Sequence, residues 1–168
     1  MGMMGIALGL LVLAGQGAPA EEVGACARDA TSPAERAALA DAVMADGSGP
    51  ALEEIAVRVR ECAIRSGYDE ARAAPLVAAG IALLAGEEMG ARLSVAGIQI
   101  ALVDSWFAGQ DEEFRTHLPD AQSGERIVWG LNGRGVPLEP LIANAELVGG
   151  YIGMLIIAER TRLGLPLE

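Results

Sequence analysis

Lysine is absent from this sequence: all twelve basic residues are arginine, against 23 aspartates and glutamates. A net charge of −11 leaves no basic face for the phosphates of a duplex, so we expect no nucleic-acid partner. Aromatic residues make up only 4%, which disfavours sugar clefts and single-strand grooves built on aromatic platforms. Two cysteines are too few for a disulfide-dense scaffold or a four-cysteine zinc site.

Motifs for metal, cofactor or nucleophilic chemistry are missing as well. His117 is the only histidine, so a histidine-rich metal site is excluded. The sequence contains no Cys-x-x-Cys-His haem motif, no Gly-x-Ser-x-Gly elbow and no glycine-rich phosphate loop after a strand. We therefore expect neither a metal nor a cofactor.

The first twenty residues have the pattern of a secretory signal peptide. An apolar run of about twelve residues, Met3 to Ala14, carries no charge and is too short to span a bilayer. Ala18-Pro19-Ala20 then supplies an A-x-A cleavage site. The pattern predicts export to the periplasm or beyond, with residues 1–20 removed and one domain from residue 21 to 168.

A lipoprotein site is the alternative reading of the same region. Val23-Gly24-Ala25-Cys26 resembles a relaxed lipobox, after which the cysteine would be lipidated. Glu21 and Glu22 separate that cysteine from the apolar run, whereas a lipobox follows the run directly. We therefore favour cleavage after Ala20 without lipidation.

Export would place two cysteines, Cys26 and Cys62, in an oxidising compartment, where the default outcome is one disulfide. It closes a loop of about 37 residues and is expected to stabilise the fold by about 3–4 kcal/mol. The spacing is not that of a redox-active Cys-x-x-Cys pair, so a structural role is predicted.

Apolar spacing and capping residues predict an all-α fold, a compact bundle of five or six helices with one disulfide. Ser32, Pro33 and Glu35 form a capping box with proline at the first helical position. Proline is expected to end a short turn before Pro75, and Gly86 to Gly90 to interrupt the chain again. No run alternates with the period of a strand. The expected helices cover residues 33–46, 50–66, 75–85, 91–107 and 140–163, with a short one at 111–118.

The apolar runs at 74–86 and 93–107 each stay below 18 residues, so no transmembrane span is predicted in the mature chain. On the final helix, Ala145, Gly149 and Gly153 lie four residues apart. Small residues at this spacing let another backbone approach closely. Either a neighbouring helix of the same chain packs there, or two copies form a homodimer through Gly149 and Gly153.

Residues 108–139 form a polar connection rich in turn signals, and such long connections often bind or cover a ligand. Within it, His117, Trp129 and Arg134 are the candidate partner-binding residues, because aromatic and arginine side chains are enriched at binding hot spots. The alternative is a solvated connector in which Trp129 only covers the core.

Four residues are the only candidates for acid or base catalysis. Asp104 lies in an apolar segment, where burial would raise its pKa, although pairing with an arginine or exposure is more usual. Glu87 and Glu88 lie at an expected helix junction, and His117 lies on an exposed short helix. Because no catalytic set is assembled, we predict a non-enzymatic function.

The sequence thus predicts an exported periplasmic interaction protein whose partner is another envelope protein. An inhibitor, an immunity-type binder or an envelope accessory factor would fit this class. The alternatives are a small helical hydrolase or lyase that uses acidic residues, and a carrier for an apolar ligand between the two apolar helices.

The export prediction is tested by the intact mass of the protein isolated from the cell envelope. We expect a chain that begins at Glu21 and carries no lipid, because the A-x-A site precedes that residue. A chain that retains Met1, or a diacylglycerol on Cys26, would contradict this prediction.

Overall fold

The computed structural model describes residues 18–45, 47–118 and 121–166, and all regular structure in these ranges is helical. The predicted all-α fold with one disulfide is confirmed, with nine helices in the described ranges instead of five or six. Most of the predicted signal peptide, residues 1–17, lies outside the described residues. The helices are α1 (Ala18–Asp29), α2 (Pro33–Ala45), α3 (Pro50–Arg65), α4 (Glu70–Val95), α5 (Ile100–Ala108), α6 (Glu112–Thr116), α7 (Ala121–Asn132), α8 (Leu138–Ala143) and α9 (Ala145–Leu163).

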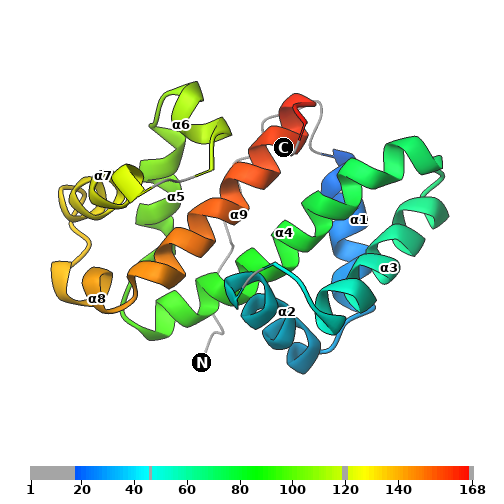
Figure 1. Ribbon diagram of the computed structural model, residues 1–168, viewed down its shortest axis with the longest axis horizontal. Coiled ribbons are helices and arrows are strands. Elements are labelled where there is room, and N and C mark those ends of the chain that lie inside the picture. Colours follow the sequence, from blue (N-terminus) through cyan, green and yellow to red (C-terminus); the bar gives the residue numbers. More distant parts are fainter. Residues whose placement is uncertain (1–17, 46, 119–120, 167–168) are drawn as a thin grey trace, which may run out of the picture.

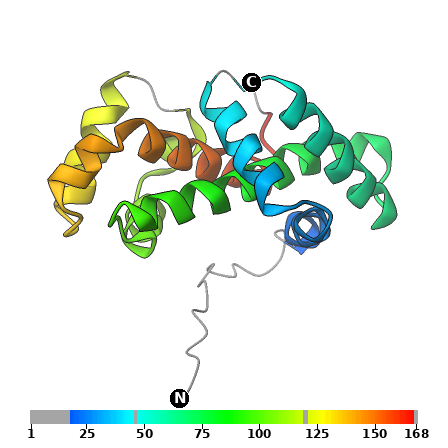
Figure 2. The same ribbon diagram turned by 90° about the horizontal axis from the view of Figure 1, so that it is seen from below.

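The two longest helices, α4 and α9, form the centre of the molecule and share its most extensive helix contact. Helices α1, α2 and α3 pack around α4 on one side, and α5 to α8 lie on the other side of α9 (Figures 1 and 2). The molecule therefore has an N-terminal half and a C-terminal half that meet at the α4–α9 pair.

Glycines lie at the contact between α4 and α9. A Cβ atom added to Gly86 would lie 3.5 Å from Met154 Cβ, and one added to Gly90 would lie 3.4 Å from Tyr151 Cε2. On α9, Gly150 lies against the sulfur atoms of Met44 and Met89. Since Gly86 faces Met154 and Gly90 faces Tyr151, the two helices run antiparallel.

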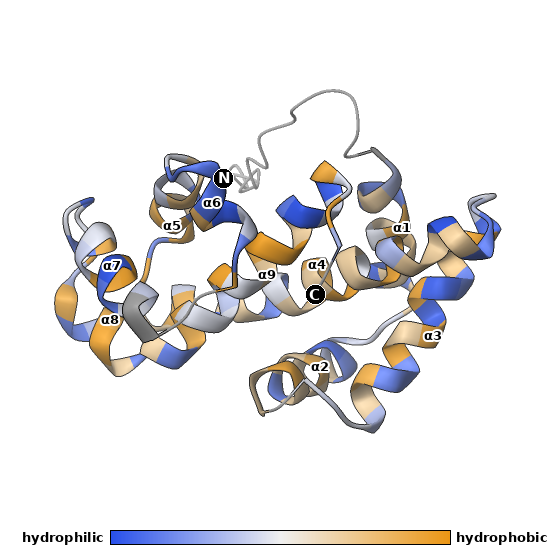
Figure 3. Ribbon diagram, turned by 45° about the horizontal axis from the view of Figure 1, so that its top comes forward, coloured by the Kyte–Doolittle hydropathy of each residue, from blue (hydrophilic) through white to orange (hydrophobic). Residues whose placement is uncertain are grey.

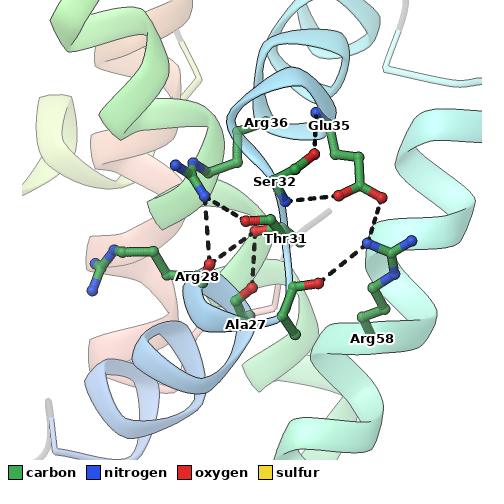
Figure 4. A network of polar contacts seen from close by, with 8 residues as sticks. Ala27, Arg28, Thr31, Ser32, Glu35, Arg36 and Arg58 are labelled. Atoms are coloured by element: carbon green, nitrogen blue, oxygen red, sulfur yellow. Dashed lines mark hydrogen bonds and ion pairs between the residues drawn. The ribbon is translucent and has the colours of Figure 1, made fainter.

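The predicted capping box at the start of α2 is confirmed (Figure 4). The Ser32 amide donates to a Glu35 carboxylate oxygen at 2.7 Å, and the Glu35 amide donates to Ser32 Oγ at 3.3 Å. Arg58 of α3 pairs with Glu35 at 2.6 Å and donates to the Ala30 carbonyl. These hydrogen bonds, that from the Ser32 amide first, lower the pKa of Glu35 to about 2. The network holds the α1–α2 turn against α3.

The predicted disulfide joins Cys26 of α1 to Cys62 of α3, with 5.9 Å between the Cα atoms. As predicted, Cys62 lies on the buried face of its helix, beside Ile55 and Val59. An Nη2 atom of Arg65 lies 3.3 Å from Cys26 Sγ and 3.2 Å from Cys62 Sγ. The bond fixes α1 across α3 and closes the loop that contains α2.

The prediction of separate helices at 75–85 and 91–107 was wrong, because α4 continues from Glu70 to Val95 with Pro75 inside it. Asp69 caps the helix by accepting a hydrogen bond from the Arg72 amide at 2.9 Å. Pro75 lies near this start and removes only the bond to the Ala71 carbonyl. Pro75 and Ala71 are both exposed, so that carbonyl is on the solvent side of the helix.

Residues 86–90 do not interrupt the helix, because Gly86 and Gly90 serve close packing against α9. The helix ends instead beyond Val95, where Gly97 adopts a φ of 83° that favours glycine. Helix α5 then starts at Ile100 and contributes Val103, Trp106 and Phe107 to the core.

By length and composition alone, α4 could cross a membrane, with an 18-residue window that is 56% buried against the rest of the protein. We expected no apolar run of this length because an interruption was predicted at residues 86–90, and α4 is continuous there. The central helix of a folded core passes the same test, and α4 is surrounded by α1, α2, α3 and α9.

Two further elements differ from the prediction. Helix α7 occupies much of the segment expected to be a connector, and its buried Ile127 and Leu131 are spaced by one turn. The helix expected over 140–163 starts at Leu138 and is divided at Asn144, whose amide group donates to the Pro140 carbonyl. The result is the short helix α8 followed by α9.

The packing at the glycines predicts opposite effects for two glycine-to-alanine changes. In Gly80→Ala, the new Cβ would lie 2.5 Å from Cγ1 of Val59, which is fully buried and stiff, so we expect a loss of about 1–3 kcal/mol. In Gly149→Ala, the new Cβ meets nothing within 4 Å, so we expect a gain of about 0.5–1 kcal/mol from helix propensity. Urea unfolding measures both, and equal changes would contradict the packing.

Candidate functional site

The carboxyl-terminal part of the predicted partner-binding segment lies with α8 at the end of the molecule that is farthest from α3 (Figure 1). We call helices α7 and α8, with the turn between them, the α7–α8 end (residues 121–143). Helix α7 packs against α5 and α9, and α8 packs against α9.

Aromatic contacts fix α5, α6 and α7 together. The rings of Trp106 and Phe114 meet edge to face, with centroids 5.3 Å apart. The Arg126 guanidinium lies 4.5 Å from the centroid of Phe114 and also binds Asp111 at 2.8 Å. Gly130 lies directly against the Trp106 indole, where no side chain would fit. One face of α7 thus packs against α5 and α6.

Trp129 lies on the opposite face of α7 and is 63% exposed. Ile127 and Leu131 turn inwards, so the helical period directs the residue between them to solvent. Trp129 therefore presents most of its surface to solvent. On α8, Ile142 is 62% exposed, so the α7–α8 end presents two large apolar side chains.

Arg134 follows α7 in an exposed turn and forms no ion pair with any residue that the structure describes. A Cβ atom on Gly109 would lie 3.4 Å from its Nη2 atom, which places the guanidinium at the carboxyl end of α5. A cation is favourable there because of the helix dipole. Arg134 is therefore oriented by the protein but left without a carboxylate partner in the described chain.

His117 caps the carboxyl end of α6 and is exposed. Its Nδ1 atom lies 2.8 Å from the Glu113 carbonyl oxygen, and no contact between described residues joins it to Trp129 or Arg134. The structure thus places Trp129 and Arg134 on one helix and its following turn, whereas His117 belongs to the preceding element.

The two glutamates proposed as acid or base candidates are held in ion pairs. Glu87 accepts from Arg28 Nε of α1 at 2.9 Å, and Glu88 accepts from Arg92 Nε at 3.0 Å. Arg92 also binds Asp41 of α2 at 2.5 Å. These pairs join α1 and α2 to α4 and do not converge with Asp104 or His117.

Asp104 is half-buried at the contact between α5 and α9 and accepts a hydrogen bond from the Tyr151 hydroxyl at 2.8 Å. Burial raises the pKa of the Asp104 carboxyl, and the hydrogen bond from Tyr151 offsets part of that effect. Burial first, and then the nearby carboxylate, raise the pKa of Tyr151 well above its ordinary value. The pair ties α5 to α9.

Metal-ligating side chains do not gather in the part of the chain that the structure describes, where no three or more His, Cys, Asp or Glu residues could hold an ion. Two open hollows flank α3. One, of about 300 Å³, lies between α2 and α3, and the other, of about 350 Å³, lies between α3 and α4. Neither encloses a ligand-sized space or contains one of the four proposed catalytic residues.

Gly149 and Gly153 do not serve close packing within the chain, since a Cβ atom on either would meet nothing within 4 Å. The close approach is made by Gly150, which the four-residue spacing did not include. Gly153 is nevertheless buried in the chain, and Gly149 is half-buried.

Sequence reasoning missed Ile142 because α8 was read as part of one long helix. It also missed Val57 and Ile64, which are 57% and 50% exposed on α3. Their spacing of seven residues, on the side opposite Ile55 and Cys62, was the available signal.

No family model, no curated protein and no solved structure matches this chain.

The Asp104–Tyr151 pair predicts a pH-dependent effect on stability. Because the folded-state pKa is raised, ionisation of Asp104 costs stability as the pH rises through its titration. Asp104→Asn keeps an acceptor for Tyr151 without the charge, and should raise the free energy of unfolding at about pH 7. Half-exposure limits the gain to less than about 1 kcal/mol.

The gain should disappear at about pH 3, where the native carboxyl is protonated. Tyr151→Phe, which removes the donor, should make the wild-type pH dependence steeper. Urea unfolding across this range measures both variants, and an Asp104→Asn protein that is less stable at neutral pH would contradict the argument.

Proposed function

We propose that this chain is an exported, non-enzymatic helical protein that binds another envelope protein through its α7–α8 end. The exposure of Trp129 is the observation that carries the proposal. A tryptophan that is 63% exposed in water contributes a large apolar area to a partner that buries it.

Export is supported by two features of the N-terminal region. The Cys26–Cys62 disulfide is compatible with an oxidising compartment, and the uncharged apolar run before Ala18-Pro19-Ala20 has the pattern of a signal peptide. Cleavage after Ala20 would remove the first turn of α1, and Glu21 would then begin the helix. A carboxylate is favourable at that position.

The composition of the α7–α8 end resembles that of a binding hot spot. Trp129 and Ile142 offer apolar area, and Arg134 offers a guanidinium that has no carboxylate partner in the described chain. Tryptophan and arginine are the residue types that carry most binding energy at interfaces. An inhibitor, an immunity-type binder or an envelope accessory factor would use such a surface.

The alternatives receive less support. A hydrolase or lyase would need convergent acidic residues, but Glu87 and Glu88 are engaged by arginines and Asp104 is engaged by Tyr151. A carrier would need an enclosed apolar space, but the two hollows beside α3 are open. A homodimer through Gly149 and Gly153 stays a proposal, which sedimentation of the native chain against Gly149→Leu, at the half-buried position of the two, would test.

The binding proposal is tested with a photocrosslinking amino acid at Glu125, which is exposed one turn before Trp129. In intact cells we expect one envelope protein to crosslink from this position, and none from Val95, which is 91% exposed at the end of α4. Trp129→Ala in the same background should reduce the adduct at least about tenfold. Val57→Ala is the matched control and should leave the adduct unchanged.

The double variant His117→Ala/Arg134→Ala adds a second arm, because both side chains are exposed and should leave the melting temperature nearly unchanged. Loss of the adduct at an unchanged melting temperature is the expected result. An adduct that persists in both the Trp129 variant and the double variant would show that the α7–α8 end is not the binding surface.

A further inference from the structure

A second surface, unrelated to the α7–α8 end, lies on α3. Val57 and Ile64 are 57% and 50% exposed, and they are seven residues apart, so they lie on one face of the helix. In Figure 3 apolar and polar residues are banded along α3. Exposed β-branched side chains two turns apart form the apolar row to which a partner helix can align.

A hollow of about 350 Å³ lies beside this row, between α3 and α4. Four of its six lining residues are apolar, namely Ala56 and Val57 of α3 and Ala74 and Val77 of α4. Because Val57 belongs to both, the row and the hollow are continuous. We call the six lining residues and Ile64 the α3–α4 groove (Ala56, Val57, Arg60, Ile64, Glu70, Ala74 and Val77).

Negative charge borders the groove. Glu53 and Glu61 are exposed on α3 and form no ion pair with any described residue, whereas Glu54 lines the other hollow, between α2 and α3. The arginines of α3 are all engaged. Arg58 binds Glu35, Arg60 binds Glu70 across the groove, and Arg65 contacts the disulfide sulfur atoms.

Arg72 is the remaining nearby cation without an ion pair in the described chain. It lies two residues from Ala74 on α4, and the helical period directs it away from the groove. The surface therefore combines an apolar centre with carboxylates that form no ion pair with the arginines beside them.

We propose that the α3–α4 groove binds an amphipathic helix that has an apolar stripe flanked by Lys or Arg. The apolar side chains of that helix would cover Val57 and Ile64 and enter the hollow, and its cations would face Glu53 and Glu61. The distance from Val57 to Ile64 is about 10 Å along the helix axis, which is two turns of the bound helix. Opposite charges at the rim would set its orientation and speed its association.

The probe is a fluorescent 21-residue peptide of three heptads, with Leu at a and d and Arg at e and g. Like charges at e and g keep the peptide from pairing with itself. The matched control peptide has Glu in place of every Arg. Fluorescence anisotropy with the whole disulfide-bonded chain should show saturable binding of the Arg peptide, at least about tenfold tighter than that of the Glu peptide. The difference should shrink as salt is added.

Matched variants locate the binding surface. Val57→Ser/Ile64→Ser should weaken binding of the Arg peptide at least about tenfold. Val95→Ser/Ile142→Ser makes the same two substitutions at exposed positions outside the groove, and should bind as the native chain does. Urea unfolding of both variants checks that the fold is kept.

Several results would overturn the proposal. One is the absence of saturable binding up to about 1 mM peptide. Equal binding of the Arg and Glu peptides would also overturn it. So would binding that is weakened only in the Val95→Ser/Ile142→Ser variant. Sedimentation provides the last: if the native chain dimerises and Val57→Ser/Ile64→Ser abolishes the dimer, a second copy occupies the groove. None of these results depends on Trp129, so they leave the proposed function of the α7–α8 end to its own test.

Discussion

The contact between α4 and α9 determines how the other helices are placed. Gly86 and Gly90 of α4 lie against Met154 and Tyr151 of α9, and Gly150 of α9 lies against Met44 of α2 and Met89 of α4. A helix as apolar on every side as α4 is stable in water only when neighbours cover it. The N-terminal helices and α9 supply that cover, and the disulfide, the capping box and the arginine pairs then fix those helices in position.

The sequence could predict those parts of the fold that depend on local signals. The capping box at Ser32 and Glu35 needs only residues three apart, and the pairing of Cys26 with Cys62 needs only that no other cysteine competes. The glycines could not be read in the same way. Gly97 ends a helix through a positive φ, whereas Gly86 allows a contact with a helix more than sixty residues away in the chain. A single sequence does not say which of these two uses a glycine has.

The candidate site was predictable in part for the same reason. Trp129 was identified as a candidate by residue type, but its exposure follows from α7, which turns Ile127 and Leu131 inwards. Because residues 108–139 were interpreted as a polar connection rich in turn signals, that helix was not expected. Gly130 is in fact required by the Trp106 indole on the neighbouring helix α5. The exposed residues of α3 had a readable spacing, but the hollow beside them depends on where α4 lies.

The contact between α4 and α9 has a consequence for how the two ends of the molecule are connected. Helix α4 alone has 26 residues and is about 39 Å long. Its amino end borders the α3–α4 groove, and the antiparallel α9 begins at the α7–α8 end. The pair therefore connects the two outer surfaces of the molecule through one continuous helix contact.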